Sequence, residues 1–411
     1  MYFLYNIAIY ITIFGLKLIS IFNKKIQFFL VGRKETFHKL ESSISKNDKT
    51  IWFHCASLGE FEQGRPIMEE IKKKHKDYKI VLTFFSPSGF EVQKDFAFAD
   101  VITYLPLDTC ANAKKFLSIV HPKIAVFVKY EFWPNILDEL QKQKIETILI
   151  SGIFRREQSF FKSYGSWMRK SLKAFSHFFV QNTTSKDLLY GIGLENVTVS
   201  GDTRFDRVYE ITKQDNNLDF IAKFKQNKYM MVAGSTWPKG EKYLVNYINF
   251  HASEKEKFII APHNINQQQI NELQNSITKS TTKFTDKNRD YSAQVFILNT
   301  IGILTKVYNY ADVSYVGGGF GKGGLHNVLE PATFGLPLII GPNFDKFQEA
   351  VDLVALGSCK SVQNQKEMDF ELQKLSNDVS YREQNGQRSK DYILRNIGAT
   401  QIILKYISNK L

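Results

Sequence analysis

The chain has 411 residues, of which 43% are hydrophobic and 23% are charged. Single hydrophobic cores stop growing at roughly 250–300 residues, so this length predicts two domains, and the composition excludes a disordered or polytopic membrane protein. The 54 Lys and Arg residues outnumber the 41 Asp and Glu residues, giving a formal net charge of +13. This excess suits nucleic acid, an anionic membrane surface or a phosphorylated substrate. The three cysteines are far apart, which indicates a reducing compartment and no disulfide framework.

The first segment has the composition of a membrane-associated helix. Residues 1–16 carry no charge, and the apolar stretch resumes after Lys17 as far as residue 22, just enough to span a bilayer at about 20 residues. Four basic residues lie within residues 24–34, which by the positive-inside tendency places the remaining chain in the cytoplasm. Because no basic residue precedes the apolar run, a cleaved signal peptide fits poorly. A spanning helix, a helix lying on the membrane and a buried first helix all remain open for residues 1–26.

From residue 51 onward, short apolar runs alternate with amphipathic stretches. Residues 65–75 and 111–120 have helical patterns, and the β-then-α rhythm predicts a parallel sheet covered by helices on both faces. The runs that we expect to form buried strands are 51–55, 80–85, 124–128, 147–151 and 178–181.

The rhythm restarts after a polar stretch near residues 208–228. Residues 27–210 are therefore expected to form one Rossmann-like domain and residues 211–392 a second, and residues 393–411 a final helix. Two such domains would face each other across a cleft lined by the carboxyl ends of strands, where open α/β sheets bind ligands. The strands expected in the second series are 229–233, 258–261, 295–298, 313–316 and 338–340.

The first candidate site follows the strand at 51–55. Ser57, Gly59 and Glu60 lie in a loop of small residues that leads into a helix. A carboxylate at this point could take a proton from a sugar hydroxyl as a general base. The commoner explanation, an acid that only offsets the helix dipole, stays open.

Two more loops favour anion binding. Ser235 and Thr236 follow a strand, where exposed N–H groups and hydroxyls suit phosphate, although an ordinary helix cap explains them too. Six glycines fall within residues 317–324, and Glu330 beyond them could accept hydrogen bonds from ribose. These glycines formally match a dinucleotide fingerprint, a weak signal for a nicotinamide-dependent oxidoreductase. The sequence has no Walker A loop, HExxH or Asp-x-Asp motif, so nothing supports a metal.

Taken together and in order, these segments resemble the Kdo transferases, which attach 3-deoxy-D-manno-octulosonic acid to lipid A precursors. The resemblance covers essentially the whole chain. The segments that carry it are His54-x-x-Ser57-x-Gly59-Glu60, Glu131-Phe132-Trp133-Pro134-Asn135, Gly201-Asp202-Thr203-Arg204-Phe205-Asp206, Gly234-Ser235-Thr236 and His326-Asn327-x-Leu329-Glu330.

The resemblance implies an inverting enzyme of the GT-B fold, in which the first domain takes a lipid IVA-type acceptor and the second takes CMP-Kdo. In such a fold the last helix, residues 393–411, is expected to cross back to the first domain. It implies that Glu60 is the base, that Arg204 stabilises charge on the departing CMP, and that Glu131 assists. CMP-Kdo is a substrate, so no cofactor and no metal are expected. The implied location is the inner membrane, with the catalytic domains in the cytoplasm on its anionic surface and no nucleic acid as partner.

The remaining site residues also follow from the resemblance. The acceptor-binding residues would be Ser57, Gly59 and Arg65. The donor-binding residues would be Ser235, Thr236, Pro262, His263, Gly302, Ile303, Gly318, Gly319, His326, Asn327, Val328, Leu329 and Glu330.

Three positions depart from the family pattern. Lys129 stands where the family often has the first acid of a Glu-x-Glu pair. Ala261 replaces the first residue and Pro262 the second of the usual Pro-Arg-His, and Leu325 interrupts Gly-Gly-His-Asn. Besides the oxidoreductase, a non-catalytic lipid-binding membrane protein stays an alternative.

Overall fold

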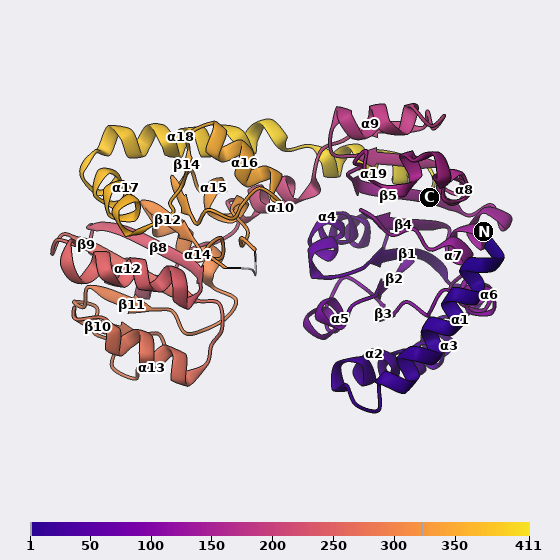
Figure 1. Cartoon of the computed structure of the whole chain (residues 1–411), viewed down its shortest axis with the longest axis horizontal. Coiled ribbons are helices and arrows are strands. Elements are labelled where there is room, and N and C mark those ends of the chain that lie inside the picture. The colour runs from indigo at the N-terminus through magenta and orange to yellow at the C-terminus, as the bar shows by residue number, and fades with distance from the viewer. Residues whose placement is uncertain (1, 322–323) are drawn as a thin grey trace. The chain divides into compact units, whose positions relative to one another are not determined.

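The computed structural model describes residues 2–321 and 324–411, so Lys322 and Gly323 of the glycine-rich run lie outside the described residues. The chain divides into two compact units (Figure 1). Unit 1 comprises Met1–Asp206 and Ile397–Leu411, and unit 2 comprises Arg207–Asn396. The first division thus falls slightly before the expected residue 210. Residues 393–396 belong to unit 2, and the other 15 residues of the expected final segment belong to unit 1.

Unit 1 is built on a parallel sheet that has seven strands in the part of the chain described, in the order β3-β2-β1-β4-β5-β6-β7. The order reverses between β1 and β4, which pair directly. This is the topological switch point, where the loops after two neighbouring strands diverge to opposite faces. The strands are β1 Lys49–Cys55, β2 Tyr78–Phe84, β3 Val101–Tyr104, β4 Ile124–Val128, β5 Glu146–Gly152, β6 His177–Val180 and β7 Val197–Val199.

Helices join these strands in the right-handed βαβ manner expected of a parallel sheet. The short 3-10 turns Ser159–Phe161 and Ser163–Gly165 precede α8. The helices of unit 1 are α1 Tyr2–Ile19, α2 Lys24–Lys34, α3 Thr36–Ser43, α4 Leu58–Lys74, α5 Pro87–Gln93, α6 Cys110–Val120, α7 Pro134–Lys142, α8 Ser166–Leu172, α9 Thr183–Tyr190 and α19 Ala399–Ser408, while α10 Thr203–Ile211 runs across the division.

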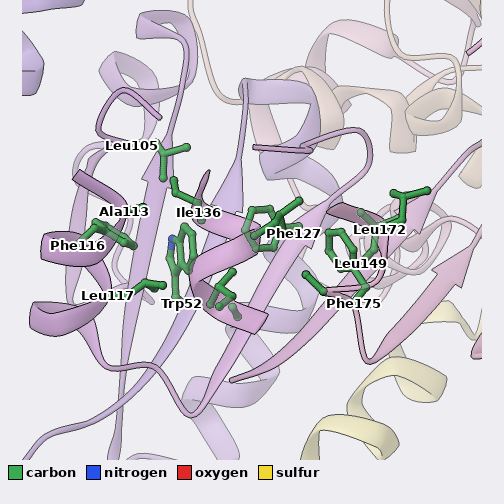
Figure 2. Packing of buried hydrophobic residues seen from close by; sticks show 14 of the residues in the cluster. Trp52, Leu105, Ala113, Phe116, Leu117, Phe127, Ile136, Leu149, Leu172 and Phe175 are labelled. Carbon is green, nitrogen blue, oxygen red and sulfur yellow. The ribbon is translucent and has the colours of Figure 1, made fainter. Parts of the chain in front are cut away.

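Alternate residues of each strand feed two cores, because successive side chains point to opposite faces. On one face Trp52 packs edge-on against Phe116 of α6 and Phe127 of β4, with ring centroids 4.7 and 5.0 Å apart (Figure 2). On the other face, β1 residues such as Phe53 join side chains of α4 and of α19, among them Ile403. The last helix is therefore part of the core of unit 1.

Unit 2 repeats the architecture, and its described sheet has seven parallel strands in the order β10-β11-β9-β8-β12-β13-β14. Its switch point lies between β8 and β12. The strands are β8 Tyr229–Thr236, β9 Glu256–Pro262, β10 Thr281–Lys283, β11 Val295–Ile297, β12 Val313–Val316, β13 Leu338–Ile340 and β14 Cys359–Ser361. The helices are α11 Asp219–Lys225, α12 Pro238–Phe250, α13 Gln267–Ser276, α14 Leu304–Val307, the 3-10 turn Tyr308–Tyr310, α15 Leu329–Thr333, α16 Gln348–Ala355, α17 Gln365–Asn377 and α18 Val379–Asn396.

Candidate active site

The loop after β1 places Glu60 at the switch point of unit 1. Ser57 is the N-cap of α4, and its hydroxyl accepts the backbone N–H of Gly59 at 3.3 Å. The same hydroxyl donates to the Glu60 carboxylate. The Glu60 side chain is only 14% exposed, so it is held in one orientation while part of it still reaches solvent.

Lys129, directly after β4, supplies the cation beside Glu60. Its backbone is left-handed with φ of 72°, a conformation that is costly for a residue with a side chain and that concentrates at functional sites. The Lys129 N–H donates to the Ile150 carbonyl at 3.0 Å, which fixes this turn. The Lys129 Nζ then lies 3.6 Å from Glu60 Oε1. The lysine that departs from the family pattern is thus an ion-pair partner of the candidate base.

Glu131 lies in the same loop and is held by the ring N–H of Trp133, with the His54 ring beside it. Trp133 Nε1 donates to Glu131 Oε2 at 2.8 Å, and Nε2 of the buried His54 lies 3.2 Å from the same oxygen. Burial raises the pKa of the Cys55 thiol, and the carboxylates of Glu60 and Glu131 raise it further. Both carboxylates therefore lie around the end of β1.

Arg204 is anchored by a buried acid. Its Nε and Nη2 lie 2.9 and 2.8 Å from Asp202 Oδ2, which Gln63 Nε2 also approaches at 3.1 Å. Burial alone would raise the pKa of Asp202, but the charge and hydrogen bonds of Arg204 outweigh it and lower that pKa. Asp202 therefore holds the guanidinium as a carboxylate.

Tyr130 links these groups. Burial raises the pKa of its phenol, Glu60 acts in the same direction, and Arg155 and Arg204 oppose them. Arg155 Nη1 donates to the Tyr130 hydroxyl at 3.2 Å. Tyr130 therefore lies in the field of the candidate base and of both arginines.

Other residues expected near the acceptor have structural partners. Arg65 pairs with Glu69 through a 2.6 Å contact one turn along α4. Phe154 and Phe160 are buried in the core. The burial of these two side chains results from the packing of strands and turns, which the order of residues along the sequence does not reveal.

In unit 2 the loops after β8 and β12 meet closely. Ser235 has a left-handed backbone, with φ of 49°, and the Thr236 hydroxyl donates to Glu241 at 2.6 Å. A Cβ on Gly317 would lie 1.9 Å from the Ser235 carbonyl oxygen, so only glycine fits there. Gly319 has φ of 61°, a conformation that glycine adopts without cost.

An aromatic cluster lies at the ends of β8 and β9 and in the glycine-rich loop. The ring of Trp237 stacks on that of His263 at 4.8 Å and donates its N–H to His326 Nε2 at 2.8 Å. Burial and then the charge of His263 lower the pKa of His326 to about 4. Because His326 Nε2 accepts a hydrogen bond from Trp237, the single proton of the neutral His326 ring lies on Nδ1. From there it can donate a hydrogen bond to an anion.

Glu330 lies beside this cluster. Asn327 Nδ2 donates to Glu330 Oε1 at 3.2 Å, and the Asn327 side chain also caps the N–H of Leu329 at 3.0 Å. Burial raises the pKa of Glu330, while the charge of Arg207 and the bond from Asn327 act against it. Val328 and Leu329 are buried and pack the loop rather than face a ligand.

The remaining donor residues occupy the edges of this region. Pro262 ends β9 beside Thr236, and Gly318 has φ of 90° within the close turn of the glycine-rich loop. Gly302, with φ of 95°, and Ile303 precede α14; an added Cβ on Gly302 would meet no atom within 4 Å. The structure thus brings Pro262, Thr236 and the aromatic cluster together but leaves Gly302 in open space.

Several residues at these sites carry no recognisable signal in the sequence. Tyr130, Trp237 and Arg207 have partners that the fold brings to them, and Lys129 was marked in the sequence only as a departure from the family pattern. Trp237 alone could have been suspected, because it directly follows Ser235-Thr236 at the end of a strand. Within residues 2–321 and 324–411, no group of three or more His, Cys, Asp and Glu side chains could hold a metal ion.

Comparison with known proteins addresses the chemistry of these loops. A family described as 3-deoxy-D-manno-octulosonic-acid transferase (kdotransferase) matches residues 32–207. The 3-deoxy-D-manno-octulosonic acid transferase of Aquifex aeolicus is 28% identical, over 82% of this chain and 88% of its own. That of Haemophilus influenzae is 24% identical, over 86% of this chain and 85% of its own.

Residues 32–207 carry the Kdo transferase domain that this family model describes, and curated Kdo transferases are similar to this chain over most of its length. These relatives are glycosyltransferases. MurG of Acinetobacter baumannii has a similar fold, with a TM-score of 0.54 at 11% identity over 88% of this chain and 99% of the other. The two parallel-sheet units are those of the GT-B fold, as the sequence predicts. In this chain, α1 is long and apolar enough to cross a membrane by length and composition.

Proposed function

We propose that the protein transfers Kdo from CMP-Kdo to a lipid A precursor of the lipid IVA type, with inversion at the anomeric carbon. Its curated relatives are named Kdo transferases over most of its length. The observation that carries the proposal is the oriented, partly exposed Glu60 carboxylate at the switch point of unit 1.

Glu60 acts as the general base. Its carboxylate takes the proton of an acceptor sugar hydroxyl, and the oxygen forms a bond to the anomeric carbon of Kdo on the face opposite CMP. The bond from that carbon to the phosphate oxygen breaks, and its electrons leave with CMP. Ser57 and Lys129 hold the carboxylate in place, and preorganisation of this kind is what proximity catalysis requires.

Arg204 stabilises the negative charge that develops on the CMP phosphate. Its bond to Asp202 fixes the guanidinium before the reaction, so little reorganisation is needed in the transition state. Glu131, held by Trp133 and His54, is the second carboxylate near the reacting atoms.

Unit 2 holds the donor. The N–H groups of the glycine-rich loop and the Nδ1–H of His326 suit its anionic groups, and Glu330 suits the ribose hydroxyls. Ser235, Thr236, Pro262 and His263 complete this set, whereas Gly302 and Ile303 would have to move or bind an extended part of the donor.

The protein acts at the cytoplasmic surface of the inner membrane, where its acceptor is anchored. The apolar α1 and the net charge of +13 support this location, since basic groups near an anionic leaflet contribute about 1 kcal/mol each.

The test is incubation with CMP-Kdo and lipid IVA, followed by the mass of the product. One or more Kdo increments are expected, and their number reports how many residues are added. NADH oxidation without any mass increment would instead favour a nicotinamide-dependent enzyme, and no turnover with tight lipid binding a non-catalytic protein.

Glu60→Gln should lower turnover by about 100- to 10,000-fold, because only the proton acceptor is lost. CMP binding, measured by calorimetry, should not change. Glu69→Gln on the same helix is the matched control and should stay active. Near-normal turnover of Glu60→Gln would refute the role of the base.

A further inference from the structure

Helix α1 is attached to unit 1 by polar side chains in its first two turns. The Tyr2 hydroxyl donates to Asn135 Oδ1 at 2.6 Å, and the Tyr5 hydroxyl donates to Asp108 Oδ2 at 2.7 Å. Asn135 Nδ2 donates to Asn6 Oδ1 at 3.0 Å. Figure 1 shows α1 lying along unit 1 beside α6 and α7, to which these partners lead.

Asp108 makes this attachment specific. Its two carboxylate oxygens accept the backbone N–H groups of Asn135 and Ile136 at 3.0 and 2.9 Å, at the start of α7. Burial raises the pKa of Asp108, while the bonds from Tyr5 and from these N–H groups oppose that rise. Without Tyr5 this buried carboxylate loses a donor, which is costly in a dry environment.

The opposite face of α1 is apolar and exposed. Phe3 is 75%, Ile11 66% and Phe14 65% exposed. The exposed surface continues beyond the helix to Phe22 and Phe28, and none of the residues of α1 is fully buried.

The charge around this face has one sign. Residues 1–34 contain five Lys and Arg residues and no Asp or Glu. Lys17, Lys24 and Lys34 are exposed, and a wide apolar face with such cations in the same segment matches a bilayer whose headgroups are anionic.

We infer that α1 lies flat in the headgroup region of an anionic membrane while docked on unit 1 through Tyr2, Tyr5 and Asn6. It does not cross the bilayer. Its length of 18 residues, about 27 Å against a hydrocarbon core of about 30 Å, would allow a crossing, so its attachment to unit 1 decides. To cross, it would have to leave unit 1, break the bonds to Asp108 and Asn135, and carry Asn6 into hydrocarbon. This inference rests on the membrane association proposed above but not on the transfer reaction.

The first experiment is alkaline carbonate extraction of membranes that contain the full-length protein. A helix lying in the interface is expected to release the protein into the supernatant, whereas protein that stays in the pellet would overturn the inference.

The second experiment is flotation with vesicles of phosphatidylethanolamine and phosphatidylglycerol. Ile11→Asp combined with Phe14→Asp should reduce bound protein at least tenfold, and Phe370→Asp, an exposed phenylalanine of unit 2, should bind like the wild type. Normal vesicle binding by the Ile11→Asp, Phe14→Asp double variant would overturn the inference. So would dimers that form through this face in a protein that does not bind vesicles.

A third measurement tests the docking itself. Tyr5→Phe with Asn6→Ala should lower the melting temperature of the lipid-free protein by several degrees and make α1 sensitive to protease. An unchanged melting temperature and protease pattern would show that α1 is not docked. Glu60→Gln should float like the wild type, so failure of the transferase proposal and failure of this inference are distinguishable.

Discussion

Asp202 and Arg204 show how one ion pair can serve both stability and reactivity. Asp202 is nearly fully buried and is paired with the guanidinium through two contacts to one oxygen. A buried carboxylate that loses its cation is strongly destabilising. The effect on the reaction must therefore be separated from the effect on folding.

Arg204→Ala should lower kcat about 100-fold, as expected when one preorganised donor to a charged transition state is removed. The KM for CMP-Kdo should change little, since the interaction strengthens only as CMP departs. Arg204→Lys keeps the charge, spares Asp202 and should retain part of the rate. An unaltered kcat in Arg204→Ala would contradict the role in charge stabilisation.

His326 predicts a pH dependence of stability. Its pKa falls from 6.5 to about 4 in the folded protein, so between these values the unfolded chain binds a proton that the folded chain does not. Stability of unit 2 should therefore be complete above pH 6.5 and decline as the pH falls toward 4. The contribution is at most about 1–2 kcal/mol, because the ring is partly exposed and screened.

The measurement is urea unfolding of the wild type and of His326→Asn at several pH values between 4 and 7. The variant lacks the titrating ring and should show a shallower decline. Parallel curves for the two proteins would show that His326 does not titrate as inferred.

At the scale of elements, Asp206 fastens the last helix to unit 1. Its carboxylate accepts the backbone N–H of Gly398 at 2.5 Å, and both the N–H and the hydroxyl of Thr400 at 2.8 and 2.9 Å. These groups form the start of α19, where unpaired N–H groups are otherwise unsatisfied. The last residue of the Gly201–Asp206 segment thus serves as a helix cap.

Asp206→Ala should lower the free energy of unfolding by about 1–2 kcal/mol, the usual effect of losing such a cap. Denaturant unfolding measures it. Asp215→Ala, which removes a single exposed contact to Asn217, is the control and should change stability far less. Equal stability of both variants would contradict the capping role.

At the scale of the whole molecule, the two units predict separate responses to a nucleotide. CMP at 100 times its Kd should stabilise the unit that binds it by about 2.7 kcal/mol. Calorimetry should resolve one transition that Asp206→Ala lowers, which marks unit 1, and another that CMP raises. Glu60→Gln should keep the CMP shift and Glu330→Gln should reduce it. If CMP raised only the transition of unit 1, which Asp206→Ala marks, the donor would bind unit 1, and the proposal that unit 2 holds it would be wrong.

The sequence by itself determined the two series of parallel strands and the helices that separate them; Glu60, Ser235 and Glu330 lie in the first turn of α4, at the end of β8 and in α15. Apolar periodicity and strand-loop-helix order are local properties, so they can be recognised in a linear chain. The strands β3, β7, β10 and β14 were not predicted. Of these, β10 (Thr281–Lys283) and β14 (Cys359–Ser361) lack the apolar run that marks the equally short β11 and β13.

Only the tertiary structure decided the partners of these residues. The Lys129–Glu60 pair, the Trp237–His326 bond and the Asp206 cap of α19 each join positions between 69 and 194 residues apart. The same holds for α1, whose composition fits a spanning helix and whose hydrogen bonds to Asp108 and Asn135 attach it to unit 1. Such contacts depend on which strands the fold makes neighbours, and no local pattern carries that information.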